Sequence, residues 1–93
     1  DDILLNNDIG AIVDEIEIFE GTTLIGQDIK SFDFLKYNLT LIGIVDAKDK
    51  TKFAFNPLNK GYIVKEKDIL IVIGYKSSIY DLRIDLMTFR REV

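Results

Sequence analysis

The sequence predicts an α+β domain: a small, mostly antiparallel β-sheet with two helices, in the order strand, helix, three or four strands, helix. Its centre is the run at residues 69–73, five aliphatic side chains between Asp68 and Gly74. A short run rich in β-branched residues is typical of a strand that is covered on both faces. A chain of 93 residues offers little material for covering both faces from within. We therefore expect a partner surface to cover the remainder of the sheet.

The length and composition indicate one domain with a thin core. The sequence contains no cysteine and no histidine, which excludes a disulfide framework and a zinc site built from these ligands. An enzyme is not expected, because a nucleophile–base pair is difficult to assemble without these two residue types. No apolar stretch approaches the ~20 residues of a membrane span, so we expect no direct membrane insertion.

Charge is unevenly distributed along the chain. Acidic residues outnumber basic residues 16 to 12, and every charged residue before Lys30 is acidic. An acidic surface repels phosphate backbones, so nucleic acid is not expected as a partner. The acidic residues fit a solvated surface, and a cation site built from them is the alternative.

The first 26 residues contain one predicted strand. Residues 1–11 are expected to be a lead-in segment, and residues 12–93 to form the single domain. Because the chain begins with Asp rather than Met, we expect the domain to belong to a longer protein. Acidic and apolar residues alternate within residues 12–19, which predicts a strand with Ile16 and Ile18 facing the core.

A short helix is predicted over residues 27–35. Ile25, Ile29 and Phe32 occur at i, i+4 and i+7, the spacing of one helical face. Asp28 lies where an acidic residue favours a helix N-terminus.

Two further strands are predicted at residues 39–47 and 51–55, joined by a polar turn. In the second, alternation places Phe53 and Phe55 inward. The first is apolar on both faces, with Leu39, Leu41 and Val45 on one and Ile42 and Ile44 on the other.

The end of the chain is predicted to form a second helix. A loop at residues 56–61, which contains Pro and Gly, and a brief strand at residues 62–64 precede the central run. After Gly74 the period becomes helical, and Ser78 begins a capping-box spacing. The apolar residues at helical intervals are Ile79, Leu82, Leu86 and Phe89, and Arg90 and Arg91 suit a helix C-terminus.

Several of these segments share their order and spacing with a known family. The matching residues are Glu17-Ile18-(2)-Gly21-(2)-Leu24-Ile25-Gly26-(2)-Ile29-(3)-Asp33, Leu41-Ile42-Gly43-Ile44, Asn56-Pro57 and Asp68-Ile69-Leu70-Ile71-Val72-Ile73-Gly74. From Val13 to about Leu82 the chain resembles the C-terminal domain of regulators of potassium conductance, called the RCK-C or TrkA-C domain. It departs from the family at Lys67, where the family usually has Gly, and in a shortened link at residues 35–38.

The resemblance implies a cytosolic regulatory domain that binds a ligand and dimerises. Such a domain belongs to a potassium channel, transporter subunit or antiporter at the cytoplasmic face of the cell membrane, controls gating, and follows a Rossmann-like subdomain. Some members bind cyclic di-AMP at the dimer interface, and in others the regulatory ligand is a cation or is unknown. We therefore expect cyclic di-AMP or a divalent cation as the regulatory ligand. The alternatives are a small-molecule sensor fused to a different transporter or antiporter, and a purely structural dimerisation module.

The resemblance also implies where the ligand binds. In members that bind cyclic di-AMP, the first helix and the surrounding strands line the pocket, and the matching positions here are Ile29, Phe32, Phe34, Thr40, Asn56 and Pro57. Aromatic rings can stack on adenine, and Asn or Thr can bond its edge. The only basic residues close by in the sequence are Lys30 and Lys36.

The dimer interface is assigned to Phe34, Tyr37, Leu39 and Leu41, and no metal site is assigned. The alternative is that the aromatic residues of this region, with Phe53 and Phe55, only pack the core and the dimer interface. That role is the more common one for apolar residues at helical spacing.

Overall fold

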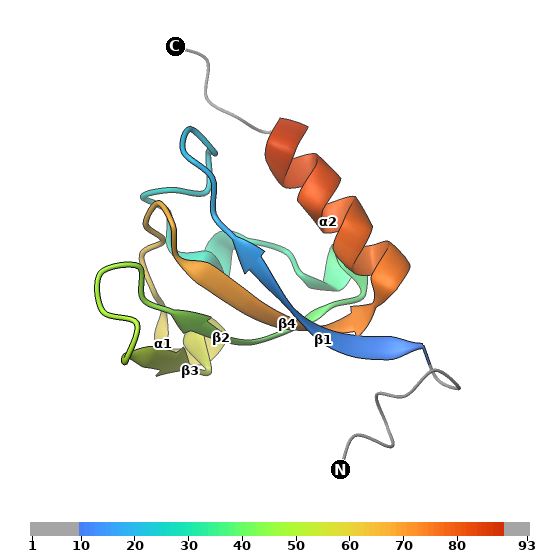
Figure 1. Ribbon diagram of the computed structural model, residues 1–93, viewed down its shortest axis with the longest axis horizontal. Coiled ribbons are helices and arrows are strands. Elements are labelled where there is room, and N and C mark those ends of the chain that lie inside the picture. Colours follow the sequence, from blue (N-terminus) through green and yellow to red (C-terminus); the bar gives the residue numbers. More distant parts are fainter. Residues whose placement is uncertain (1–9, 89–93) are drawn as a thin grey trace.

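The computed structural model describes residues 10–88, which form a four-stranded sheet and the helical segments packed against it (Figure 1). The sheet order is β1-β4-β2-β3, and every neighbouring pair is antiparallel. This confirms the predicted α+β class and the antiparallel sheet. The strands are β1 (Ala11–Glu17), β2 (Thr40–Val45), β3 (Phe53–Phe55) and β4 (Ile69–Tyr75).

The apolar run forms β4, a central strand of the sheet. Leu70 and Val72 are fully buried, in the same core cluster as the apolar side chains of helix α2 (Lys76–Thr88). The side chains that alternate with them, Ile69, Ile71 and Ile73, are only partly buried. The chain thus covers one face of β4 completely and the other face in part, and dimerisation stays a prediction.

β1 begins the described part of the chain. Ile16 lies in this strand and Ile18 directly after it, and both are buried as predicted. The N–H of Ile18 donates to the C=O of Asp68 at 2.9 Å, which ties the end of β1 to the start of β4. Residues 1–9 lie outside the described residues, so the lead-in segment and the domain boundary stay predictions.

The helix predicted over residues 27–35 is wrong. The backbone of this region pairs with a distant segment: the N–H of Ile29 donates to the C=O of Tyr62 at 2.8 Å, and Asp28 forms an isolated antiparallel bridge with Ile63. Asp28 is therefore extended, and a continuous helix cannot pass through it. The region contains two short 3₁₀ turns instead, η2 (Ile29–Ser31) and η3 (Leu35–Tyr37).

β2 contains a β-bulge that changes the predicted faces. Its register with β4 shifts between Leu41 and Gly43, so Ile42 is an extra residue and is exposed. Beyond the bulge the alternation is reversed, and Leu41 and Ile44 are both buried in the core. The prediction that placed them on opposite faces is corrected accordingly.

The prediction that the two phenylalanines of β3 face the core is also wrong. Phe55 is 68% exposed and Phe53 is half-buried, whereas Ala54 between them packs against the core. The two rings contact each other with centroids 4.6 Å apart. Phe53 lies over Gly43, where an added Cβ would be 2.2 Å from the ring.

A single helical turn, α1 (Pro57–Lys60), forms inside the predicted loop. Proline suits the first helical position because it has no N–H to leave unpaired. Gly61 ends the turn with φ of 90°, a conformation that favours glycine. The strand predicted at residues 62–64 is reduced to the one bridge between Ile63 and Asp28.

α2 follows β4 without a loop and lies across the sheet (Figure 1). It begins at Lys76, so Ser78 is inside the helix and its predicted capping role is wrong. Phe89, Arg90 and Arg91 lie outside the described residues. Within residues 10–88, no helix combines the length and apolar character needed to cross a membrane. The apolar residues predicted to face the core are buried: Ile79, Leu82 and Leu86.

Candidate ligand-binding site

A hollow of about 300 Å³ opens between η2, η3, the start of β2 and α1. This volume is at the lower end of the range for small-molecule pockets. Three of the six predicted ligand-binding residues, Phe32, Phe34 and Thr40, line it together. The full lining is Lys30, Phe32, Asp33, Phe34, Leu35, Leu39, Thr40, Leu41 and Leu58.

The other three predicted residues lie outside the lining. Ile29 is fully buried in the core, and Pro57 is buried directly before Leu58, which does line the hollow. Asn56 precedes α1 in the left-handed region, with φ of 53°, and its side chain does not cap the helix. Phe32, Phe34 and Thr40 thus lie together at one hollow, whereas ligand contact stays a prediction for all six residues.

One carboxylate fixes the backbone at the edge of the hollow. Asp28 accepts hydrogen bonds from the N–H groups of Lys30 and Tyr62, each at 3.1 Å. These bonds stabilise the ionised form and lower the pKa of Asp28. The side chain therefore holds η2 against the segment that follows α1, and it orients the residues that come next, Phe32 among them.

Aromatic rings form a cluster beside the hollow. Phe32 meets Phe34 edge-on with centroids 4.8 Å apart, and its ring is parallel to that of Tyr37 at 6.0 Å. Phe34 and Tyr37 are buried, whereas Phe32 is half-buried and lines the opening. Phe32 is thus the aromatic ring of this group with surface left for a planar ligand.

The charged residues of the lining are one base and one acid, Lys30 and Asp33. Thr40 is exposed and adds a hydroxyl that can donate and accept. Lys36, the other basic residue noted in the sequence, does not line this hollow: its ammonium lies 5.5 Å from the centroid of the Tyr37 ring. A phosphate bound here would be neutralised by Lys30.

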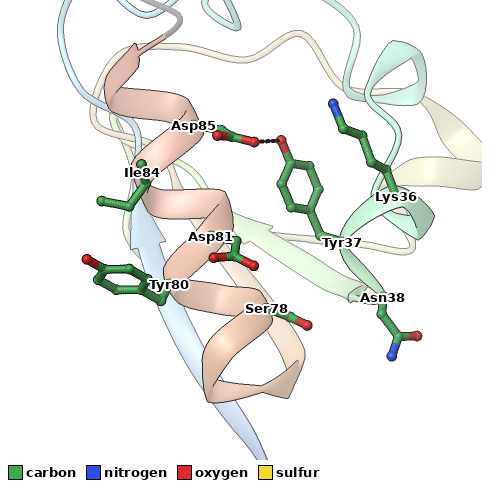
Figure 2. A pocket seen from close by; sticks show the side chains of 8 residues that line it. All are labelled: Lys36, Tyr37, Asn38, Ser78, Tyr80, Asp81, Ile84 and Asp85. Atoms are coloured by element: carbon green, nitrogen blue, oxygen red, sulfur yellow. Dashed lines mark hydrogen bonds between the residues drawn. The ribbon is translucent and has the colours of Figure 1, made fainter.

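Sequence reasoning missed Leu58 and a larger hollow of about 590 Å³ on the other side of η3 (Figure 2). This second hollow lies between residues 36–38 and α2, and in Figure 2 the Tyr37 hydroxyl points at Asp85, to which it donates a hydrogen bond. The pKa of Tyr37 is raised to about 12, mainly because the hydroxyl is buried and secondly because it donates this hydrogen bond to Asp85. No local pattern predicts this hollow, because its two sides are about 40 residues apart in the sequence.

The four residues assigned to a dimer interface all lie in the protomer's own core. Each is less than a tenth exposed: Phe34, Tyr37, Leu39 and Leu41. Such side chains have little surface left for a second molecule, so their assignment to an interface stays a prediction. Within residues 10–88, no group of three acidic side chains is arranged to hold a metal ion.

The solved structures that resemble this chain include the following two. The C domain of the regulator of conductance of K⁺ in the potassium transport protein KtrA, solved in complex with cyclic diadenosine monophosphate, has a TM-score of 0.69 and 24% identity; the match covers 88% of this chain and 87% of that one. S. agalactiae BusR, in complex with its busA-promotor DNA, has a TM-score of 0.66 and 18% identity; the match covers 96% of this chain and 46% of that one. Neither the protein-family models nor the curated proteins gave a match.

These likenesses bear on the fold. Identities of 24% and 18% carry no residue roles across, but TM-scores near 0.7 over nearly the whole chain show a shared architecture. This chain spans less than half of the BusR chain, so that protein contains further regions. The KtrA match is to a domain of the same kind that the motif spacing indicated. The chain therefore has the fold of the RCK C domain.

Proposed function

We propose that this chain is a regulatory, ligand-binding domain of a potassium transport protein, and that its ligand is cyclic di-AMP. One observation supports this more than any other: Phe32, Phe34 and Thr40, chosen from the sequence, line one hollow in a fold that binds this ligand in KtrA. The proposal gives the domain no catalytic role.

The lining suits one adenine and one phosphate. The exposed part of the Phe32 ring would stack on the base, and the Thr40 hydroxyl would bond its polar edge. Lys30 would neutralise one phosphate, while Leu35 and Leu58 at the rim exclude water. Cyclic di-AMP contains two adenines and two phosphates, so one hollow accounts for half of it.

A homodimer would supply the second half. Two copies related by a two-fold axis present two identical hollows, and a ligand with the same symmetry can fill both. Leu35 is 87% exposed at the rim, so it is available for a contact between copies, with the buried Phe34, Tyr37, Leu39 and Leu41 as support beneath it.

Calorimetric titration with cyclic di-AMP tests the proposal. Loss of stacking in Phe32→Ala should weaken binding by about 5- to 150-fold, the equivalent of roughly 1–3 kcal/mol. Because Phe32 also contacts Phe34 and Tyr37, a second variant is needed that leaves the core intact, and Thr40→Val, at an exposed position, should weaken binding as well. Phe55→Ala is the matched control, since it removes an exposed aromatic ring away from the hollow and should bind as the natural sequence does.

Titrations with Ca²⁺ and with linear nucleotides complete the experiment. If Ca²⁺ is the only ligand that gives a binding heat, the regulatory ligand is a divalent cation rather than cyclic di-AMP. No heat from any of these ligands would contradict the ligand-binding proposal and favour the alternative of a structural dimerisation module.

The setting of the domain is part of the same proposal. We place it at the cytoplasmic face of the membrane, after a Rossmann-like subdomain, in a system whose gating it controls. A sensor attached to a different transporter or antiporter is the alternative, and the sequence preceding Asp1 distinguishes the two. Because the chain has a net charge of −4, we expect no DNA binding by the domain itself, although BusR shows that this fold also occurs in a DNA-bound protein. A mobility-shift assay with duplex DNA checks this expectation.

A further inference from the structure

The solvent side of α2 carries an apolar stripe that the protomer does not bury. Tyr80, Ile84 and Met87 are 64%, 40% and 52% exposed. They occur at i, i+4 and i+7, the spacing of one helical face, and they lie away from the residues that α2 buries in the core. In Figure 2, Tyr80 and Ile84 project to the same side of the helix, opposite the side that meets Tyr37.

The stripe has the spacing of a coiled-coil seam, in which apolar residues alternate at intervals of four and three. With Ile84 at position a, Tyr80 and Met87 occupy position d. The flanking e and g positions of such a helix determine which partner it accepts and in which orientation.

The two flanks of the stripe carry opposite charges. Lys76 and Arg83 occupy the g positions, and Asp81 occupies the e position. Arg83 is already paired with Asp14 at 3.1 Å. Lys76 and Asp81 form no ion pair within residues 10–88, so both charges are available to a partner.

We propose that α2 packs in parallel against α2 of a second copy of this chain, with Tyr80, Ile84 and Met87 as the seam. In a parallel pair the g flank of each helix faces the e flank of the other, so Lys76 of one copy meets Asp81 of its partner, and the reciprocal pair forms by symmetry. An antiparallel pair would place g against g and e against e, which brings like charges together. The charge pattern therefore favours a second copy in the parallel orientation.

Two hollows border the seam and give it room to interdigitate. One of about 200 Å³ lies between α2 and β1 and includes Tyr80, Lys76 and Ile12 in its lining. The larger hollow of Figure 2 also includes Tyr80 and Ile84. Side chains of the partner can enter these spaces in the way that knobs enter holes in a coiled coil.

The contact is short. The 13 residues of α2 span about 20 Å, and three apolar side chains per copy make a small interface. The pairing is thus weak by itself. The α2 pairing uses none of the residues that line the ligand hollow, so it can be tested without ligand.

Charge reversal tests the orientation. By sedimentation velocity, Lys76→Glu and Asp81→Lys should each weaken self-association by about three- to tenfold, because each creates two like-charged pairs per dimer. The double variant restores both pairs with exchanged signs and should return to the natural association constant. Lys50→Glu is the matched control: it changes the net charge as Lys76→Glu does, at an exposed position away from α2, and should leave association unchanged.

Cysteine cross-linking gives a second readout, and the natural sequence contains no cysteine to interfere. Parallel packing puts Met87 next to its own counterpart, so Met87→Cys should oxidise to a disulfide-linked dimer much faster than a Lys50→Cys control. The α2 proposal would be overturned if the charge reversals left the association constant unchanged. It would also be overturned if Met87→Cys formed a disulfide-linked dimer no faster than Lys50→Cys. The calorimetric result would remain separate, because ligand binding is measured at the other hollow.

Discussion

Lys67 is held in a conformation that its side chain disfavours. Its φ is 72°, in the left-handed region, and its N–H donates to the C=O of Ile18 at 2.9 Å. The position precedes the buried Asp68 and is the one at which the sequence departs from the glycine usual in RCK-C domains. Replacing Lys67 by Gly should therefore relieve backbone strain and stabilise the fold.

The magnitude follows from two opposing effects. In the left-handed region, a residue with a Cβ destabilises the folded state by roughly 1–2 kcal/mol relative to Gly. The greater freedom of Gly in the unfolded chain offsets about 0.4–1 kcal/mol of this. The free energy of unfolding should rise by about 0.5–1 kcal/mol, which for a chain of this size corresponds to a Tm increase of about 2–8 °C.

Thermal and urea unfolding of Lys67→Gly, followed by circular dichroism, measure this change. Lys67→Ala is the control, because it removes the same charge and side chain but keeps the Cβ that causes the strain. We expect Gly to exceed Ala in stability. If the Ala variant gains as much as the Gly variant, the effect arises from charge or side-chain entropy, and the strain assigned to this position is refuted.

Three further predictions concern packing, a buried charge and pH. Gly43→Ala should destabilise the fold by about 1–3 kcal/mol, because the added Cβ would lie 2.2 Å from the Phe53 ring; urea unfolding checks this, and Gly43→Ala/Phe53→Ala should recover part of the loss. Asp68→Asn should cost about 1–3 kcal/mol, since the fully buried carboxylate accepts two backbone N–H groups at 2.7 and 2.8 Å and an amide can accept through only one of its two atoms; an unchanged urea midpoint would contradict this. The raised pKa of Tyr37, about 12 against an ordinary 10.0, means that the neutral hydroxyl contributes stability in full below pH 10 and loses it as the pH rises toward 12. Tyr37→Phe, which cannot ionise, should flatten the pH dependence of unfolding in this window, and an unchanged dependence would contradict a raised pKa of Tyr37 in the folded state.

The sequence was sufficient where a pattern depends on residues that are close together in the chain. Alternation identified β1, and the run of β-branched residues identified β4 as a central strand. The buried stripe of α2 followed from helical spacing. The same spacing at Ile25, Ile29 and Phe32 predicted a helix that does not form, because the backbone of Asp28 and Ile29 pairs with the segment after α1.

The candidate site was predicted in part. Motif spacing selected Phe32, Phe34 and Thr40, which line one hollow, but it could not supply Leu58 or separate Lys30 from Lys36. Leu58 reaches the hollow because α1 folds back beside β2, and Lys36 leaves it because η3 turns that side chain toward the second hollow. Both placements depend on chain directions that local composition does not encode.

By itself, then, the sequence determined which segments are extended, which residues are apolar enough for a core, and the kind of fold. The tertiary structure alone decided which face of β3 is inward, where β2 bulges, and which surfaces remain open. A period of two says that neighbouring side chains point to opposite faces, but not which face meets the core. At β3 that choice was made by Gly43, whose missing side chain leaves room for Phe53 on the face away from the core.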